Sequence, residues 1–170
     1  MKKRKTRQIF TSFILATAII FTVLFSGYTT IKSEAASYIS KSTFRSYKSI
    51  SINRQTRVTH SRGYGKVKYT AKKSGYYTFH FSDARVGTSP NVIGQMNITI
   101  YRYKGNYLYP IQWSNGYSTV AISTPARRRR YGGYLSYNLS FRMNKGQSVV
   151  ISTTFLTNRM CNYNIKVTRK

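Results

Sequence analysis

The sequence predicts an all-β protein: a single antiparallel β-sandwich of the jelly-roll type that follows an N-terminal signal peptide. Two observations carry this prediction. Apolar and polar residues alternate with a period of two in one segment after another from about residue 65 onward. Gly, Asn, Ser or Pro residues separate these segments, and strong helical periodicity is absent. About seven to nine short strands with polar outer faces indicate two sheets that pack face to face.

Residues 1–35 have the pattern of a secretory signal peptide. Basic residues precede an apolar stretch over residues 9–25, and Ser33 and Ala35 stand where a signal peptidase prefers small side chains. We therefore expect cleavage after Ala35 or Ala36. The alternative is an uncleaved membrane anchor, because the apolar stretch is nearly long enough to span a bilayer. The long basic start resembles signal peptides of Gram-positive bacteria and predicts a secreted protein, extracellular or retained at the cell wall.

The remaining chain is strongly cationic. Removing 35 of the 170 residues leaves 135, which is enough for one domain with its own core. We expect residues 36–64 to form a lead-in with the first strand or strands, and residues 65–170 to form the body of the same domain. This part keeps 23 Lys and Arg against one acidic residue, Asp83, so its net charge is about +22. Such a balance implies an anionic partner or surface.

The expected strands follow one another along the body of the domain. In chain order they are the segments GKVKYTAKK, YYTFHFS, MNITIYRYKGN, YLYPIQW, STVAIS, LSYNLSFRM, QSVVISTTF and YNIKV. Residues 84–95 are expected to be a long loop, and Pro110 indicates a sheet edge or a bend. The alternation assigns a set of side chains to the core: Tyr77, Phe79, Phe81, Leu139, Phe141, Ile151, Tyr163 and Ile165.

Four of these segments, in the same order, resemble bacterial pre-peptidase C-terminal domains. They are YTAKKSGYYTFHFS, ITIYRYKGN, LSFRMNKGQSVVIST and the closing YNIKV, and the similarity covers about residues 65–168. The resemblance implies a small secreted jelly-roll-like sandwich that aids targeting or substrate binding. Two departures from the family are expected: the domain should stand alone instead of following an enzyme, and the acidic residues common in such modules are missing. No calcium-type site is therefore expected.

Several kinds of chemistry are excluded by composition. A single carboxylate after residue 35 cannot form the pair that general acid/base or glycosidase chemistry uses, and it cannot build a calcium or magnesium cage. His60, His80 and Cys161 match no spacing of a zinc site or of a nucleophile with its base. We therefore predict a protein that is not an enzyme and that uses no metal or cofactor.

Cys161 is the only cysteine, so no disulfide can form within the chain. The segment CNYNIKV alternates and places Cys161 on the same face as Tyr163, Ile165 and Val167. A small buried core residue is the favoured interpretation. Dimerisation through the thiol is the alternative.

The chemistry that is present is an interleaving of Lys, Arg and Tyr. Basic side chains bind phosphates or sulfates as charge-assisted donors, and tyrosines offer flat stacking surfaces for sugars or bases. We expect a hairpin to place Tyr76 on the same outer face as the lysines of the preceding strand. The predicted polyanion-binding residues are Lys66, Lys68, Lys72, Tyr76, Arg102, Lys104, Arg127, Arg128, Arg129, Arg130, Tyr131 and Tyr134.

The segment Arg127–Arg130 is expected to be a protruding loop whose charges share a bound anion, and it is the principal contact in this prediction. A proteolytic processing site is the alternative, because exposed polybasic loops attract proteases.

Three functions fit these observations. The first is a secreted, non-enzymatic protein that binds anionic polymers of the cell envelope, such as teichoic acid. The second is a cationic antimicrobial or toxin-like protein that acts on anionic bacterial membranes. The third is binding of extracellular nucleic acid, although no RRM, OB or KH signature is present. No obligate protein partner can be inferred.

Overall fold

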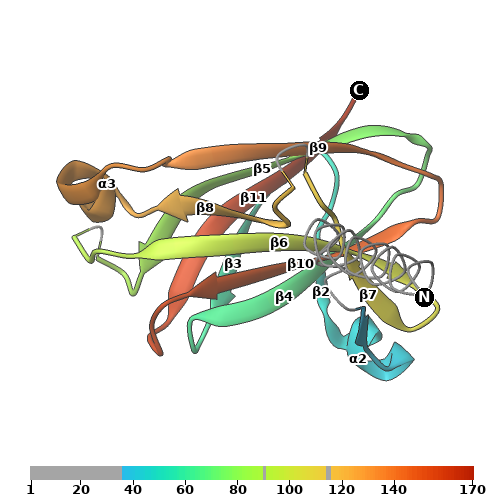
Figure 1. The fold of residues 1–170 in the computed structure, drawn as a ribbon, viewed down its shortest axis with the longest axis horizontal. Coiled ribbons are helices and arrows are strands. Elements are labelled where there is room, and N and C mark those ends of the chain that lie inside the picture. Colours follow the sequence, from blue (N-terminus) through green and yellow to red (C-terminus); the bar gives the residue numbers. More distant parts are fainter. Residues whose placement is uncertain (1–35, 90, 114–115) are drawn as a thin grey trace, which may run out of the picture. The chain divides into compact units, whose positions relative to one another are not determined.

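Two β-sheets packed against each other form the described part of the chain, which comprises residues 36–89, 91–113 and 116–170 of a computed structural model (Figure 1). The predicted all-β sandwich is confirmed. The predicted signal peptide lies outside the described residues, so its cleavage stays a prediction. No helix in the described ranges is long and apolar enough to cross a membrane.

Within these ranges the larger sheet has seven strands and the smaller has four. The seven-stranded sheet has the order β1 (Ser37–Tyr38), β7 (Tyr107–Pro110), β6 (Gln95–Lys104), β10 (Ser148–Phe155), β4 (Tyr64–Thr70) and β2 (Lys48–Ser49), and β8 (Thr119–Ser123) also pairs with β6. The four-stranded sheet has the order β3 (Gln55–His60), β11 (Cys161–Arg169), β5 (Gly75–Val86) and β9 (Ser136–Met143). Two short helices are α2 (Lys41–Ser46) and α3 (Pro125–Tyr131). The described strand pairs are antiparallel, except that β2 is parallel to β4.

The alternating side chains meet between the sheets as predicted. All eight side chains assigned to the core from the sequence are buried, and the rings of Phe79 and Phe141 stack at 5.2 Å. Cys161 is fully buried too, and burial raises the pKa of its thiol to about 11. The favoured interpretation of Cys161 as a core residue is confirmed.

Strands β4 and β5 do not form the expected hairpin. β4 pairs with β10 in one sheet, and β5 pairs with β11 and β9 in the other. The chain crosses between the sheets because Tyr69 on β4 and Tyr77 on β5 bury their rings in the same core from opposite sides, 5.5 Å apart. Tyr76 therefore lies on a different outer face from Lys66 and Lys68, and the prediction of a shared face is wrong.

The expected loop over residues 84–95 is shorter than predicted. β5 continues to Val86 and β6 begins at Gln95, so only residues 87–94 connect them. The alternation of β5 is interrupted at Asp83, which has a φ of 52° and lies where the register against β11 shifts. Such a bulge breaks the period-two pattern, and the buried residues resume at Ala84 and Val86.

The arginine segment is a helix and not a loop. The side chain of Thr124 caps its N-terminus by accepting a hydrogen bond from the Arg127 amide at 3.3 Å, and Pro125 occupies the first turn. Gly132 ends the helix at a φ of 75°. The basic residues of the last turn also interact favourably with the negative end of the helix dipole. Local capping therefore accounts for a structure that charge repulsion alone would not predict.

Candidate functional site

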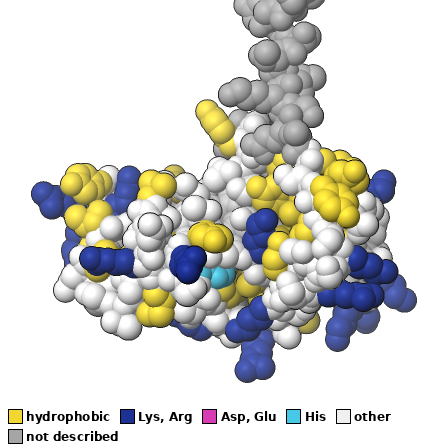
Figure 2. All heavy atoms as spheres, turned by 90° about the horizontal axis from the view of Figure 1, so that it is seen from below, with side chains coloured by type: hydrophobic (Ala, Val, Ile, Leu, Met, Phe, Trp, Pro, Cys, Tyr) yellow, Lys and Arg dark blue, Asp and Glu magenta, His cyan; other side chains and the backbone are white. Residues whose placement is uncertain are grey.

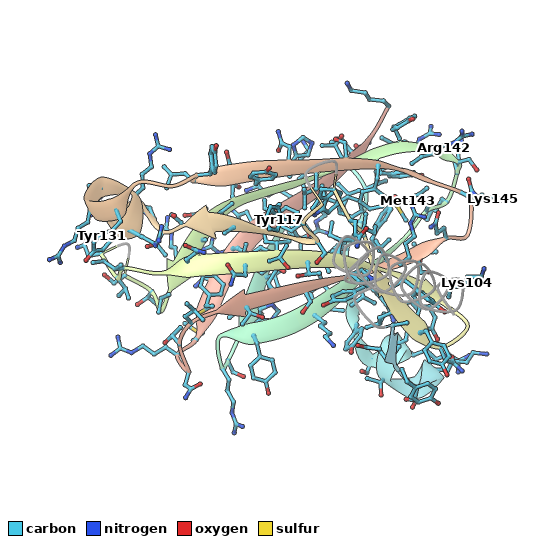
Figure 3. All side chains as sticks on the ribbon, viewed as in Figure 1. Lys104, Tyr117, Tyr131, Arg142, Met143 and Lys145 are labelled. Atoms are coloured by element: carbon cyan, nitrogen blue, oxygen red, sulfur yellow. The ribbon has the colours of Figure 1, made fainter. Side chains whose placement is uncertain are left out.

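A groove of about 960 Å³ opens at the end of the sandwich opposite α3, between the β6–β7 hairpin and the β9–β10 turn. We call it the basic groove. Figure 3 shows Lys104, Arg142 and Lys145 at this end and Tyr131 of α3 at the other. The residues that line the groove are Arg102, Tyr103, Lys104, Gly105, Tyr107, Tyr109, Arg142, Asn144, Lys145 and Gln147.

One wall of the groove is a continuation of the core face of β6. Met96, Ile98 and Ile100 point into the core and are fully buried, and the next residues on that face are the exposed Arg102 and Lys104. β7 pairs with this end of β6, so that Tyr109 lies opposite Arg102 and Tyr107 lies opposite Lys104. Cross-strand partners share a face of the sheet. Two cations and two half-exposed tyrosine rings therefore project together from the end of the core.

The hairpin turn fixes this pairing. Gly105 and Asn106 both have positive φ angles, 56° and 66°, as a two-residue type I′ turn requires. The Tyr103 hydroxyl donates a hydrogen bond to Asn106 Oδ1 at 2.9 Å, and its ring stacks on Phe44 at 3.9 Å. This wall is therefore rigid where it carries its charges.

The other wall comes from the four-stranded sheet and the turn that follows it. Arg142 is on β9, and Lys145 is in the turn 144–147. The Lys145 amide donates to Ser74 Oγ at 2.9 Å, and the Gly146 amide donates to the Ala71 carbonyl at 2.7 Å. These bonds attach the turn to the β4–β5 connection and hold Lys145 at the rim of the groove.

No acidic side chain among the described residues neutralises the groove. Among the described residues, Asp83 is the single acidic residue. It forms salt bridges with Arg85, at 2.7 Å, and with Arg57. Burial raises the pKa of Asp83, but hydrogen bonds from Arg85 and Arg57 outweigh this and hold the pKa below its usual value. The face in Figure 2 shows many Lys and Arg side chains and no Asp or Glu. The four groove cations are thus left available to an external anion.

A smaller hollow of about 420 Å³ adjoins the groove and shares Arg102 with it. It runs beside β9 and is otherwise neutral, with Gln112, Trp113 and Asn138 in its lining. The Trp113 ring packs on Phe141 with centroids 6.0 Å apart, and its Nε1 donates to the Ser118 carbonyl at 3.3 Å. A fixed aromatic ring and amide groups therefore lie next to the cations.

The predicted site residues are divided among three regions. Arg102 and Lys104 line the basic groove. Tyr76 lies opposite Arg142 on the outer face of the four-stranded sheet, and Lys72 is in the β4–β5 connection that holds the groove's turn.

Lys68 has a structural role, because its Nζ donates to the carbonyls of Phe44 and Arg45 at 2.9 and 2.6 Å and so caps α2. Lys66 lies nearby, with Nζ 6.0 Å from the centre of the Tyr47 ring.

The arginines of α3 do not form one binding face. Successive residues of a helix point about 100° apart, so four in a row spread around its axis. Their side chains also make separate contacts: Arg127 with Ser123 Oγ at 3.2 Å, Arg128 with the Gly133 carbonyl at 3.2 Å, Arg129 with Asn91 Oδ1 at 3.3 Å, and Arg130 with the Tyr131 ring at 5.5 Å. A single linear polymer cannot reach all four at once.

Several groove residues were missed from the sequence. Tyr107 and Tyr109 could have been found, because a two-residue Gly-Asn turn sets the register that pairs them with Lys104 and Arg102. Arg142 and Lys145 carry no such signal, since they lie on β9 and in the turn that leads from β9 to β10 in the other sheet, and they reach the groove only through packing of the sheets.

No family model and no curated protein matches the chain. Two solved structures resemble its fold. A family 35 carbohydrate binding module from Clostridium thermocellum is 17% identical over 64% of this chain and 72% of its own, with a TM-score of 0.35. CorA, a surface-associated copper-binding protein of Methylomicrobium album BG8, is 9% identical over 78% of this chain and 99% of its own, with a TM-score of 0.39. These similarities are too low to carry over a ligand.

Proposed function

We propose that this protein is a secreted, non-enzymatic β-sandwich that binds anionic polymers of the cell envelope, with a teichoic-acid-like chain of phosphodiesters as the polymer. The observation that carries the proposal is the basic groove: four cations, which have no acidic partner among the described residues, surround an open groove with exposed tyrosine rings.

The groove residues suit a repeating anion. Arg102 and Arg142 can bind a phosphate with two parallel hydrogen bonds, and Lys104 and Lys145 act as point charges. Tyr107 and Tyr109 provide flat faces on which a sugar or polyol unit between phosphates can pack. The groove is open to solvent, so an extended polymer can bind across it at any point along its length, without inserting a chain end.

The proposal moves the principal contact from α3 to the groove. The sequence alone favoured Arg127–Arg130 because four adjacent guanidinium groups concentrate charge. The helix spreads those groups around its axis, whereas the groove gathers four cations from β6, β9 and the β9–β10 turn. Local density of charge therefore favours the groove.

A pair of matched variants tests this. Arg102, Lys104, Arg142 and Lys145 are changed to Gln in one protein, and Arg127–Arg130 are changed to Gln in the other, so both lose four charges. Binding to soluble poly(glycerol phosphate) is measured over a series of salt concentrations. We expect the groove variant to reduce the slope of log affinity against log salt by roughly 2–4, by analogy with about 0.9 for each phosphate contact on duplex DNA, and the α3 variant to reduce it less.

Two further measurements sharpen the test. Tyr109→Ala keeps the charge and should weaken polymer binding by about two- to fivefold, because the glycerol units lose one flat apolar face on which to pack. Duplex DNA serves as a second probe, because DNA bound as tightly as poly(glycerol phosphate) would favour the nucleic-acid alternative. Equal losses in the two quadruple variants would show that binding follows net charge and not the groove.

A further inference from the structure

Four connections meet at the α3 end of the sandwich: residues 61–63, 87–94, 124–135 and 156–160. The register places them together, since Cys161 pairs with both His60 and Val86, and Gln95 pairs with Ser123. Figure 1 shows α3 at this end, beside the start of β6 and above the end of β10. We call these four connections the α3 end.

The exposed non-aromatic hydrophobic side chains gather in these connections. Among the described residues, the large hydrophobic side chains that are exposed and are not tyrosine are Ile93, Leu135, Leu156 and Met160, and all four belong to the α3 end. Leu156 is 85% exposed, far more than a side chain that is only at the margin of a core. Elsewhere, the exposed large hydrophobic residues are tyrosines, which carry a polar hydroxyl. This distribution is not the scatter expected of an ordinary surface.

The cations of the α3 end are all arginines. Its connections contain six Arg and no Lys: Arg62, Arg127, Arg128, Arg129, Arg130 and Arg159. At the groove end, residues 71–74 and 144–147 contain Lys72, Lys73 and Lys145 and no Arg, and the connection 50–54 contains one, Arg54. The planar guanidinium group binds phosphate through two bonds and is less strongly hydrated than an ammonium group. Arginine therefore suits a phosphate that lies beside an apolar medium.

Two of the exposed hydrophobic side chains share a surface with one of the arginines. Ile93, Leu156 and Arg127 line a common hollow of about 250 Å³ above the buried Phe155. Hydrogen bonds hold the connections together: the Gly87 amide donates to the Met160 carbonyl at 2.6 Å, and Thr124 Oγ1 donates to the Val92 carbonyl at 2.8 Å. The exposed hydrophobic residues are therefore presented by a rigid support.

We propose that the α3 end docks on an anionic lipid bilayer, with Leu156 and Ile93 entering the interface and the arginines binding lipid phosphates. A soluble polyanion would reach only some of the arginines and would gain nothing from exposed Leu156 and Ile93. A bilayer uses both, because an apolar side chain is buried just beneath a layer of phosphates. This proposal concerns a different end of the molecule from the basic groove and does not depend on polymer binding there.

The test uses vesicles of equal parts phosphatidylcholine and phosphatidylglycerol, with soluble poly(glycerol phosphate) as the phosphate source that has no apolar phase. Ile93→Ser with Leu156→Ser removes the apolar side chains at constant charge. We expect the serine pair to weaken vesicle binding by at least roughly tenfold, as the burial of exposed hydrophobic side chains implies. Its binding to the soluble polymer should not change.

A second variant reports insertion directly. Leu156→Trp places an indole at the tip, and its fluorescence is read as the difference from the parent protein, whose own tryptophan is Trp113. A blue shift on vesicles and quenching by bromine-labelled lipid support docking. Unchanged emission on bound vesicles would overturn the proposal, as would a serine pair that binds vesicles like the parent protein. Absence of vesicle binding by the parent protein would overturn it as well.

Discussion

The two ends of this sandwich carry charge of the same sign but present it differently. At the groove end, lysines, arginines and tyrosines line a concave surface between the two sheets. At the α3 end, arginines stand beside exposed aliphatic side chains on a helix and its neighbouring connections. Net charge alone does not distinguish them. In the two proposals above, one strongly basic composition serves two surfaces with different partners, and the neighbouring uncharged residues distinguish the partners.

The ends also differ in what builds them. The groove end is made by strand register, because the core-facing row of β6 passes from isoleucine to arginine and lysine where the sandwich stops. The α3 end is made by local capping, through Thr124, Pro125 and Gly132. Damage to packing and damage to capping should therefore affect the two ends unequally.

The largest expected effect comes from matched core truncations. Phe141 lines the smaller hollow that adjoins the groove, where it stacks on Phe79 and contacts Trp113, and Phe155 lies beside Ile93 and Leu156 at the α3 end. Phe141→Ala and Phe155→Ala should each lower the free energy of unfolding by roughly 3–5 kcal/mol, because each leaves a cavity in the core. Urea denaturation measures both losses.

Binding by the same two variants then examines whether the ends are independent. At a temperature where both proteins remain folded, Phe141→Ala should weaken polymer binding more than vesicle binding, and Phe155→Ala should do the reverse. If each variant weakens both kinds of binding to the same extent, the two ends do not act as separate surfaces.

Capping should give a smaller and more local effect. Thr124→Ala removes the cap of α3 and also the hydrogen bonds that Thr124 Oγ1 makes to the Gly94 amide and the Val92 carbonyl. The unfolding free energy should fall by about 1–2 kcal/mol, and vesicle binding should weaken. Ser40→Ala, which removes the cap of α2, is the matched control and should cost about 1 kcal/mol without an effect on vesicles. A Thr124→Ala protein with full vesicle binding would separate α3 from the docking surface.

The core of the fold could be predicted because alternation survives in most strands. Phe79, Leu139 and Ile165 lie in segments where apolar and polar residues alternate with a period of two, and all three are buried. The pattern failed at Asp83, where a bulge shifts the inward face, and it could not show that β4 and β5 belong to different sheets. Alternation shows which side of a strand is buried but not which strand lies beside it.

The candidate site was less predictable for a related reason. The helix at Arg127–Arg130 had local signals, since a Thr-Pro start and a Gly-Gly end are typical of helix boundaries. The prediction of a loop rested instead on the mutual repulsion of four adjacent arginines. By contrast, Arg142 and Lys145 meet Arg102 and Lys104 only through the contact between two sheets, which a single sequence does not encode in any short segment.

The smallest expected effect is a pH dependence of stability that arises near the α3 end. His60 is buried at the end of β3, with Nε2 2.9 Å from Thr153 Oγ1. Burial lowers its pKa below the ordinary value of about 6.5, so the unfolded chain takes up the proton first as the pH falls. The contribution is therefore intact above about pH 7 and is lost progressively as the pH falls below about 6.5. Cys161 and Tyr163, which lie close by, have pKa values raised by burial and do not titrate in this range. Urea denaturation of the parent protein and of His60→Gln at about pH 7.5 and about pH 5.5 measures the effect. The parent should lose more stability between these pH values than the variant. Equal losses would show that His60 accepts its proton without cost in the folded state.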